Sequence, residues 1–488
     1  MRRRQRSELQ AMSSLKFGTS GLRGLVIDLD GAPAYAWTRG FVSHLERSGQ
    51  VGSKSVLVGE DLRASSPSIA ARCAAAVKDA GWRVVACGAL PTPALAMAAM
   101  ARDAAAIMVT GSHIPDDRNG LKFYSPAGEI DKADEGGIRL AHDDLVPEIR
   151  EAAHRLDLSS VEHAGPAAIN AYVARYTDFF GKDALKGLRI GVYEQSSVAR
   201  DVLTIVLAAL GATTTGLARS DRFIPVDTEA HRPEDVELIA GWARDHGFDA
   251  IVSTDGDADR PLVAGEAGAI LRGDVLGMMT ANHLGLRTIV TPVTSSSAIE
   301  AADFAETVVR TRVGSPFVIA GMAEAARQGR AGIVGFEANG GVLLGSDVSR
   351  DGRTLDALPT RDAVLPILCA MSEIVRTGKP LSGVVADLNA GFTAADRLQD
   401  VPAERSAPFL ARLAGDRGFA EALFAPVGAI AAIDAMDGVR TIFANGEVIH
   451  YRASGNAPEL RCYIEAGSRE DALQRLAWGL GAAREALG

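Results

Sequence analysis

The chain has 488 residues, too many for one hydrophobic core, since a domain commonly holds about 150 residues. Hydrophobic residues make up 47% of it and aromatic residues 5%, a balance that favours α/β layers and excludes disorder over most of the chain. The formal net charge of −10 argues against partners such as nucleic acid or an anionic membrane, so an anionic ligand needs a local positive site.

The amino-terminal stretch is basic, but no apolar run follows it, so we expect no signal peptide. We interpret residues 1–14 as a disordered arm, with Met12 as an alternative start codon to Met1. No later apolar run is long enough to span a membrane. The cysteines show no CxxC spacing and form no disulfide framework, so we expect a cytoplasmic protein; they are Cys73, Cys87, Cys369 and Cys462.

Short β-branched runs alternate with Ala-rich and Leu-rich helical stretches in the first part of the chain. In chain order we predict a strand at 55–61, a helix at 67–81, a strand at 82–88, a helix at 93–103 and a strand at 105–112. This is the rhythm of βαβ units in a mostly parallel sheet. The rhythm restarts at 188–212 and again at 288–302, which predicts three similar units.

The pattern changes after the turn at 377–383. Alternating runs at 441–454 and 460–467, followed by a closing helix, predict a separate α+β domain. The predicted fold class is therefore α/β, with three similar α/β domains that have mixed sheets and a smaller α+β C-terminal domain, arranged around a central cleft. We expect the domains at 15–166, 167–270, 271–384 and 385–488.

The sequence TGSHI (110–114) follows the last predicted strand of the first unit. A turn at the carboxyl edge of an open α/β sheet is where such folds bind ligands. A hydrolase elbow would read GxSxG, which these residues do not match. Ser112 is a candidate nucleophile or phosphate carrier, with a helix cap or turn serine as the alternative, and Lys122 is equally ambiguous by itself.

The sequence STDGDADRPLV (253–263) places Asp255, Asp257 and Asp259 at alternate positions of a tight turn. Three carboxylates there can converge on one hard cation such as Mg²⁺, which commonly takes a substrate oxygen as a further ligand. An EF-hand loop is disfavoured, because Arg260 stands where the sharp turn needs glycine and both flanks are predicted strands. A solvated turn is the alternative.

Two later loops carry weaker signals. In GFEANGG (335–341), Glu337 and Asn339 could bind vicinal sugar hydroxyls, although an ordinary turn is an alternative. In RASGNAPELR (452–461), a phosphate could bind to Arg452, Ser454 and the backbone N–H groups of Gly455 and Asn456, with a hairpin that carries a solvated arginine as the alternative.

Taken together, the four loops and the opening KFGTSGLRG (16–24) resemble, in order and spacing, the α-D-phosphohexomutase family, which includes phosphoglucomutases and phosphomannomutases. The resemblance covers about residues 15 to 470 and assigns one loop to each of four domains. It implies a Mg²⁺-dependent enzyme that interconverts hexose 1-phosphate and hexose 6-phosphate, of glucose or mannose, through a phosphoserine and a hexose 1,6-bisphosphate. The implied partner is a small sugar phosphate, and a monomer or homodimer is expected.

The resemblance also implies roles for single residues. Ser112 would carry the phosphoryl group and face a cation held by Asp255, Asp257 and Asp259. Lys122 is the first candidate for the general base and His113 the second, while Arg260 and Arg23 would stabilise phosphoryl oxygens. Glu337 and Asn339 would bind the sugar. The non-reacting phosphate would bind at Arg452, Ser454, Gly455 and Asn456, so the last domain should close over the first three.

Some positions depart from the family pattern. The serine loop usually reads T-A-S-H-N-P, so Gly111 and Ile114 differ. In the sugar loop, Asn339 replaces a serine and Gly341 stands where bacterial phosphomannomutases often have histidine, and the phosphate loop differs at Asn456 and Ala457. The sugar preference therefore stays open, and the alternatives are a phosphoglucosamine mutase or a catalytically idle relative that binds sugar phosphates.

Overall fold

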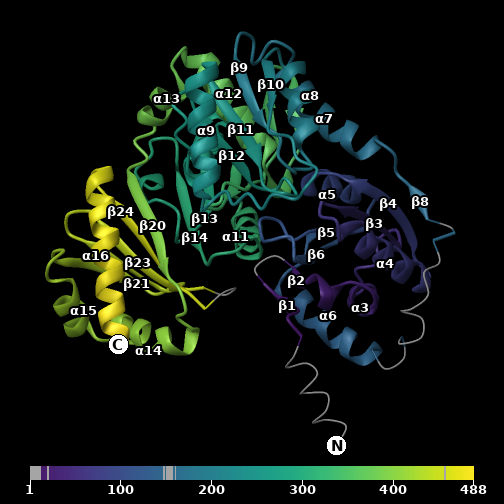
Figure 1. The fold of residues 1–488 in the computed structure, drawn as a ribbon, viewed down its shortest axis with the longest axis horizontal. Helices are drawn as coiled ribbons and strands as arrows, with labels where there is room; N and C mark the ends of the chain where they lie inside the picture. Colours follow the sequence, from purple (N-terminus) through teal and green to yellow (C-terminus); the bar gives the residue numbers. More distant parts are fainter. Residues whose placement is uncertain (1–12, 19–20, 147–148, 150–157, 160, 455–457) are drawn as a thin grey trace, which may run out of the picture.

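The computed structural model describes residues 13–18, 21–146, 149, 158–159, 161–454 and 458–488. Three α/β units with mixed sheets are followed by an antiparallel sheet covered by helices, which confirms the predicted fold class. The first unit and the C-terminal sheet lie at opposite ends of the long axis, with the other two units between them (Figure 1). None of the described helices combines the length and the apolar character that a membrane crossing needs.

The first sheet has parallel inner strands and an antiparallel edge. Its spatial order is β1 (Lys16–Phe17), β2 (Leu22–Leu25), β6 (Arg118–Ser125), β5 (Ala105–Val109), β3 (Ser55–Glu60), β4 (Arg83–Ala89) and β8 (Glu162–His163), with β7 (Gly128–Glu129) paired to β6. Strands β4, β3 and β5 run parallel, and β6 is antiparallel to β5. The helices of this unit are α2 (Val26–Leu29), α3 (Ala32–Ser48), α4 (Ser66–Asp79), α5 (Thr92–Met100) and α6 (Lys132–Leu145).

Strand β5 is apolar throughout because both faces of this sheet are covered. Ala106 and Met108 pack into the core that contains α5, whereas Ile107 and Val109 pack into the core that contains α3 and α4. The predicted strand at 105–112 ends earlier, at Val109, because the chain there leaves the sheet and enters the loop that holds Ser112.

The second and third sheets share the plan of the first. The second is ordered β10 (Thr213–Leu217), β9 (Arg189–Tyr193), β11 (Ala250–Thr254), β12 (Pro261–Gly265). The third is ordered β14 (Thr307–Thr311), β13 (Thr288–Pro292), β15 (Ile333–Phe336), β16 (Val342–Leu344), β19 (Leu358–Asp362), and a small ribbon pairs β17 (Val348–Arg350) with β18 (Arg353–Leu355). Their helices are α7 (Ala167–Phe180), α8 (Arg200–Ala209), α9 (Pro233–His246), α10 (Gly273–Leu284), η2 (Ser297–Ile299), α11 (Ser315–Arg327), α12 (Val364–Thr377) and α13 (Leu381–Asp387).

The serine, aspartate and sugar loops occupy the same place in the three sheets. Each leaves the carboxyl end of a parallel strand, namely β5, β11 or β15, and enters an antiparallel neighbour, namely β6, β12 or β16. One continuous apolar core joins helices of all three units, including α5, α7, α8, α10 and α12. This shared core fixes the three sheets relative to one another and brings their loop ends together.

The C-terminal sheet is antiparallel throughout, in the order β20 (Phe392–Leu398), β24 (Leu460–Ala466), β23 (Val448–Ala453), β22 (Val439–Phe443), β21 (Ile430–Asp434). Strand β24 buries alternate residues, Leu460, Cys462 and Ile464, in a core with residues of the helices α14 (Ala403–Gly415), α15 (Arg417–Phe424) and α16 (Arg469–Leu487). The alternation predicted at 460–467 therefore marks a sheet with one face on helices.

Candidate active site

Ser112 lies in the loop between β5 and β6, and its side chain is fully buried. Its backbone is left-handed, with φ of 58°, a conformation that residues other than glycine seldom adopt and that is often found at functional sites. The Ser112 N–H donates to Thr110 Oγ1 at 2.7 Å. The chain then turns into β6, so Ser112 caps no helix, and the helix-cap alternative is wrong.

Arg63 supports this loop from the segment after β3. Its Nη2 donates to the backbone carbonyls of Ser112 at 3.0 Å and Ile114 at 2.5 Å, and its Nη1 pairs with the Asp61 carboxylate. A Cβ atom on residue 111 would stand 2.8 Å from Cζ of Arg63. Gly111 therefore leaves room for the guanidinium, which gives a physical reason for glycine where the family pattern has alanine.

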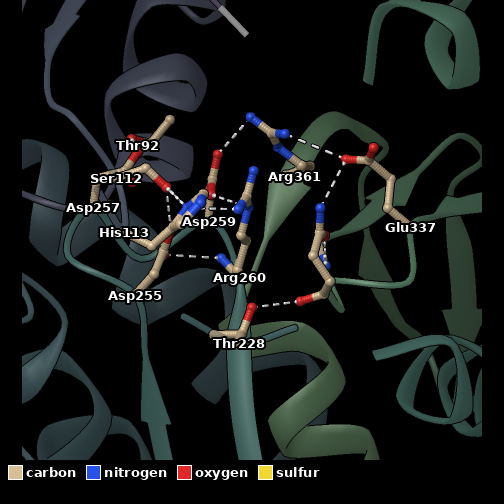
Figure 2. A network of polar contacts seen from close by, with 12 residues as sticks. Thr92, Ser112, His113, Thr228, Asp255, Asp257, Asp259, Arg260, Glu337 and Arg361 are labelled. Carbon is tan, nitrogen blue, oxygen red and sulfur yellow. Dashed lines mark hydrogen bonds and ion pairs between the residues drawn. The ribbon is translucent and has the colours of Figure 1, made fainter. Parts of the chain in front are cut away.

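The three aspartates lie in the turn between β11 and β12, and all are buried. One carboxylate oxygen from each residue lies within 4.8 Å of the corresponding oxygens of the other two. Ser112 Oγ donates to Asp255 Oδ2 at 2.6 Å, so the serine loop of the first sheet faces the aspartate loop of the second (Figure 2). Loops that are distant in the sequence therefore form one site.

Asp257 and Asp259 use only one carboxylate oxygen each for hydrogen bonds to the protein. Thr92 Oγ1 donates to Asp257 Oδ2 at 2.5 Å, and Lys122 Nζ donates to Oδ2 of Asp257 at 2.5 Å and of Asp259 at 2.6 Å. The Oδ1 atoms of both are buried and accept no hydrogen bond from any described residue. Buried oxygens without donors are costly unless a cation binds them, and carboxylate oxygens are ligands that Mg²⁺ prefers. These residues therefore fit a divalent cation.

The carboxyl groups differ in their electrostatic setting. Burial, followed by repulsion from Asp257 and Asp259, raises the pKa of Asp255 to about 8. Burial also acts to raise the pKa of Asp259, but Arg361 and Lys122 outweigh it and hold that pKa well below its usual value. Added positive charge near Asp255 would favour its ionised form. The site is thus short of positive charge on the side that faces Ser112.

His113 contacts the serine, and Arg23 interacts electrostatically with Asp257, Asp259 and Arg260 of the aspartate loop. His113 Nδ1 lies 3.2 Å from Ser112 Oγ and accepts a hydrogen bond from Arg260 Nη1 at 2.8 Å, so Nδ1 carries no proton. Burial, followed by the charge of Arg260, lowers the pKa of His113 to about 3. Arg23 Nε and Nη2, on β2, are buried without a hydrogen-bond acceptor among the described residues. Such unmatched guanidinium donors suit an anion.

The sugar loop lies on the other side of the aspartates. Asn339 Nδ2 donates to Glu337 Oε2 at 3.4 Å, and Asn339 Oδ1 accepts from the Gly341 N–H at 3.0 Å. Thr228 Oγ1 donates to the Asn339 carbonyl at 2.8 Å, which ties the loop to the second unit. Arg361 lies between Glu337 and the aspartate loop (Figure 2). The loop is thus a turn, in which the Gly340 N–H donates to the Glu337 carbonyl at 2.9 Å and the side chains are held by neighbouring residues.

The phosphate loop follows β23 in the C-terminal sheet. Arg452 Nε pairs with Asp437 Oδ1 at 2.8 Å, so Arg452 is not a solvated hairpin arginine. Gly455 and Asn456 lie outside the described residues, and Ser454 directly precedes them. Among the described residues, which include all three loops, no hydrogen bond or ion pair joins Arg452 to the serine, aspartate or sugar loops. The structure thus brings three of the four predicted loops into contact.

Three family models match successive parts of the chain. They are described as phosphoglucomutase/phosphomannomutase alpha/beta/alpha domains I, II and III and match residues 14–143, 170–268 and 272–391. The chain belongs to the phosphoglucomutase/phosphomannomutase family. This confirms the predicted resemblance, and the chain is accordingly a phosphohexomutase, an intramolecular phosphotransferase of the isomerase class.

Two phosphomannomutases are similar to this phosphohexomutase over nearly its whole length, and a phosphoglucosamine mutase over about three quarters of it. A phosphomannomutase of Sinorhizobium fredii is 48% identical over 95% of this chain and 98% of its own, and one of Salmonella muenchen is 43% identical over 94% of both. A phosphoglucosamine mutase of Sorangium cellulosum is 31% identical over 76% of both chains. The crystal structure of a phosphoglucomutase/phosphomannomutase family protein from Burkholderia thailandensis shares the fold, with a TM-score of 0.73, 20% identity and coverage of 96% of this chain and 97% of its own.

Sequence reasoning missed three residues of this phosphohexomutase site. Thr92 opens α5 and binds Asp257, Arg63 holds the serine loop, and Arg361 closes β19 between two acidic loops. Thr92 and Arg63 stand beside predicted elements, whereas no element was predicted around Arg361, and none of the three belongs to a motif. The sequence carries no signal for Arg361, because LPTRD (358–362) is not an apolar run and its burial as β19 is seen only in the structure.

Proposed function

We propose that this phosphohexomutase interconverts hexose 1-phosphate and hexose 6-phosphate through phosphorylated Ser112 and a hexose 1,6-bisphosphate intermediate. The observation that supports this most directly is the contact of Ser112 Oγ with Asp255 Oδ2 at 2.6 Å, at the edge of a buried three-aspartate cluster. A hydroxyl held there can carry a phosphoryl group next to a divalent cation.

The transfer conserves the phosphoryl group. The bond between Oγ of phosphorylated Ser112 and phosphorus breaks, while the free hydroxyl oxygen of the substrate forms a bond to the same phosphorus. The hydroxyl proton passes to a base, for which Lys122 is the first candidate and His113 the second, and Ser112 Oγ takes up a proton as it leaves the phosphorus. The bisphosphate then turns over, Ser112 Oγ gives up its proton as it takes the other phosphoryl group, and the sugar oxygen thus freed regains a proton.

Positive charge is needed where the phosphoryl group moves. Mg²⁺ held by Asp255, Asp257 and Asp259 would supply it by neutralising charge on the phosphoryl oxygens. Arg23, whose buried Nε and Nη2 have no acceptor among the described residues, would donate to these oxygens. Arg260 would hold His113 with its Nδ1 unprotonated next to the serine.

The non-reacting phosphate would bind at the C-terminal domain, at Arg452, Ser454 and the adjoining loop. Arg452 can donate two parallel hydrogen bonds to a dianion once it exchanges Asp437 for the ligand. An anchor on a separate domain would let one site accept the sugar in two orientations, because either phosphate can occupy it. The domain would close on binding.

The relatives favour mannose phosphates as substrates, since the phosphomannomutases match at 48% and 43% identity. A second candidate is a phosphoglucosamine mutase, which the Sorangium relative at 31% identity supports less strongly. Glucose phosphates are included with mannose phosphates in the first candidate function, that of a phosphoglucomutase/phosphomannomutase. Glu337 and Asn339 would contact the sugar hydroxyls that distinguish these substrates.

The test is steady-state turnover of mannose 1-phosphate, glucose 1-phosphate and glucosamine 1-phosphate, each with Mg²⁺ and a trace of the matching 1,6-bisphosphate. We expect turnover of mannose and glucose phosphates at least about tenfold more efficient than of the amino sugar, a difference of about 1.4 kcal/mol. A preference for glucosamine phosphate would establish the second candidate. A protein that binds these ligands without turnover would be an idle relative.

A further inference from the structure

Arg361 is a buried arginine that bridges the aspartate loop and the sugar loop. It stands near the end of β19 and is only 2% exposed. Its Nη2 lies 2.8 Å from Asp259 Oδ2, and its Nη1 donates to Glu337 Oε2 at 3.3 Å. A buried arginine held between two carboxylates keeps its charge, and its rigid planar end fixes the positions of both partners. The guanidinium therefore ties together two loops from different sheets.

The sugar loop leaves a space that Arg361 fills. A Cβ atom on residue 341 would stand 2.8 Å from both Cγ and Cδ of Arg361. The backbone does not itself require glycine at this position, because Gly340 has a positive φ and Gly341 does not. A Cβ atom there would also stand 3.0 Å from the Asp259 carbonyl oxygen, so Arg361 and the aspartate loop together leave no room for a side chain at residue 341. Gly341 and Arg361 form a matched pair.

The fold does not depend on Arg361 to hold β19 in place. The next residue, Asp362, accepts hydrogen bonds from Tyr172 at 2.7 Å and from Tyr176, both on α7 of the second unit. Asp362 Oδ1 also accepts from the Val364 N–H at 2.8 Å. These bonds hold the end of β19 against α7 and so fix the backbone position of Arg361. Its side chain can therefore make its ion pairs with the two loops.

Glu337 has one oxygen committed to the protein and one available. Its Oε2 accepts from Arg361 and from Asn339 Nδ2, whereas no described residue donates to its Oε1. Carboxylate oxygens bind sugar hydroxyls well when their orientation is fixed in advance. Without Arg361 the Glu337 carboxylate would lose its ion pair and would be held only by the longer bond from Asn339 Nδ2, at 3.4 Å.

We propose that Arg361 is a positioning residue that fixes the Glu337 carboxylate for the sugar hydroxyls and ties it to the aspartate loop through Asp259. The proposal rests on the proposed function, because it takes Glu337 as the sugar-binding residue of the mutase. Both ion pairs of Arg361 are with carboxylates and its side chain is closed off from solvent, so we assign it a role through Glu337 rather than in direct contact with the ligand.

The experiment is a double-mutant cycle of Arg361→Gln and Glu337→Gln in the full chain. KM and kcat are measured with mannose 1-phosphate, and the Kd of mannose 6-phosphate is measured by calorimetry on the metal-free protein. We expect Arg361→Gln to raise KM and Kd about tenfold, with a smaller change in kcat. If Arg361 acts through Glu337, the double variant should be no worse than the more impaired of the two single variants.

Arg376→Gln is a control for the loss of an arginine–carboxylate pair outside the site, because Arg376, though exposed, makes a two-bond pair with buried Glu373 in the same unit. It should lower the melting temperature without raising KM. Arg361→Lys keeps the charge and guards against a variant that fails to fold; with one ammonium for two carboxylates it should raise KM by about threefold.

Several results would overturn the proposal. One is a KM and Kd of Arg361→Gln within twofold of wild type, and another is a KM of Arg361→Lys equal to wild type. A third is a double variant whose effect equals the product of the two single effects, which would show that Arg361 has a purely structural role. A wild-type protein without mutase activity would instead contradict the proposed function, while the calorimetric cycle would still report whether Arg361 and Glu337 act together.

Discussion

Ser112 Oγ lies 2.6 Å from Asp255 Oδ2, across the boundary between the first and the second sheet. Burial and the two neighbouring aspartates raise the pKa of Asp255 to about 8, so added positive charge would be needed to keep this carboxyl fully ionised near neutral pH. A cation that binds the aspartates would therefore also favour the ionised form of Asp255, the carboxyl to which the serine hydroxyl donates. The serine and the aspartates form a single chemical unit.

Ser112→Ala should abolish turnover, by about three orders of magnitude or more, because it removes the oxygen that carries the phosphoryl group. The fold should survive, since the loop is also held by Arg63. Intact-protein mass spectrometry should find a fraction of the wild type with one additional phosphate and none in the variant. Ser125→Ala, at the far end of β6, is the control and should keep its activity.

Retention of most activity by Ser112→Ala would remove the phosphoserine from the mechanism. Loss of activity together with a large fall in melting temperature would show only that the variant is damaged, and Ser112→Cys or Ser112→Gly would then be compared in the same assays.

Asp257→Asn should weaken binding of Mg²⁺ and slow turnover, because one negative charge leaves a cluster of three. EDTA should inhibit the wild type, and excess Mg²⁺ should restore its activity fully and that of the variant only in part. Metal affinity is measured by calorimetry on the metal-free protein. Asp249→Asn, at a surface turn before β11, serves as the control. Full activity in metal-free buffer would rule out the cation.

Lys122→Arg separates charge from proton transfer. Arginine keeps a positive charge beside Asp257 and Asp259 but cannot accept a proton near neutral pH. If Lys122 is the base, kcat should fall by about a hundredfold or more while Mg²⁺ affinity changes little. His113→Gln tests the second candidate in the same assay. A larger loss of kcat in His113→Gln than in Lys122→Arg would reverse the assignment.

The sequence predicted the loops that carry the chemistry better than the contacts that hold them. Short motifs such as TGSHI and DGDAD lie within one turn, so residues close in the chain reveal them. The unprotonated state of His113 Nδ1 depends on Arg260, 147 residues away, which no local pattern indicates. The contacts of Arg63 with Ser112 and of Arg361 with Asp259 were equally unpredictable, because each joins residues of different loops or sheets. These contacts depend on which strands and sheets lie next to each other in the fold, which local sequence patterns do not show.

The phosphate anchor makes one contact that bears on domain closure. Asp437 pairs with Arg452 through Oδ1 and accepts from the Val313 N–H of the third unit through Oδ2, at 2.8 Å and 2.9 Å. Asp437 therefore links the predicted anchor to the neighbouring unit. A phosphate that takes Arg452 away from Asp437 would loosen this link, so binding and movement of the C-terminal domain should be coupled.

Arg452→Lys should lower kcat/KM by about 1–3 kcal/mol, because lysine keeps the charge but cannot donate two parallel hydrogen bonds to a dianion. Phosphorylation of Ser112 by added bisphosphate should slow as well, since that ligand would use the same anchor, whereas Mg²⁺ affinity should hardly change. Arg475→Lys is the matched control, as Arg475 Nε pairs with Glu447 at the same 2.8 Å in the same domain. If kcat/KM on mannose 1-phosphate is the same in Arg452→Lys as in Arg475→Lys, the phosphate does not bind at Arg452, and closure of the C-terminal domain over the substrate loses its main support.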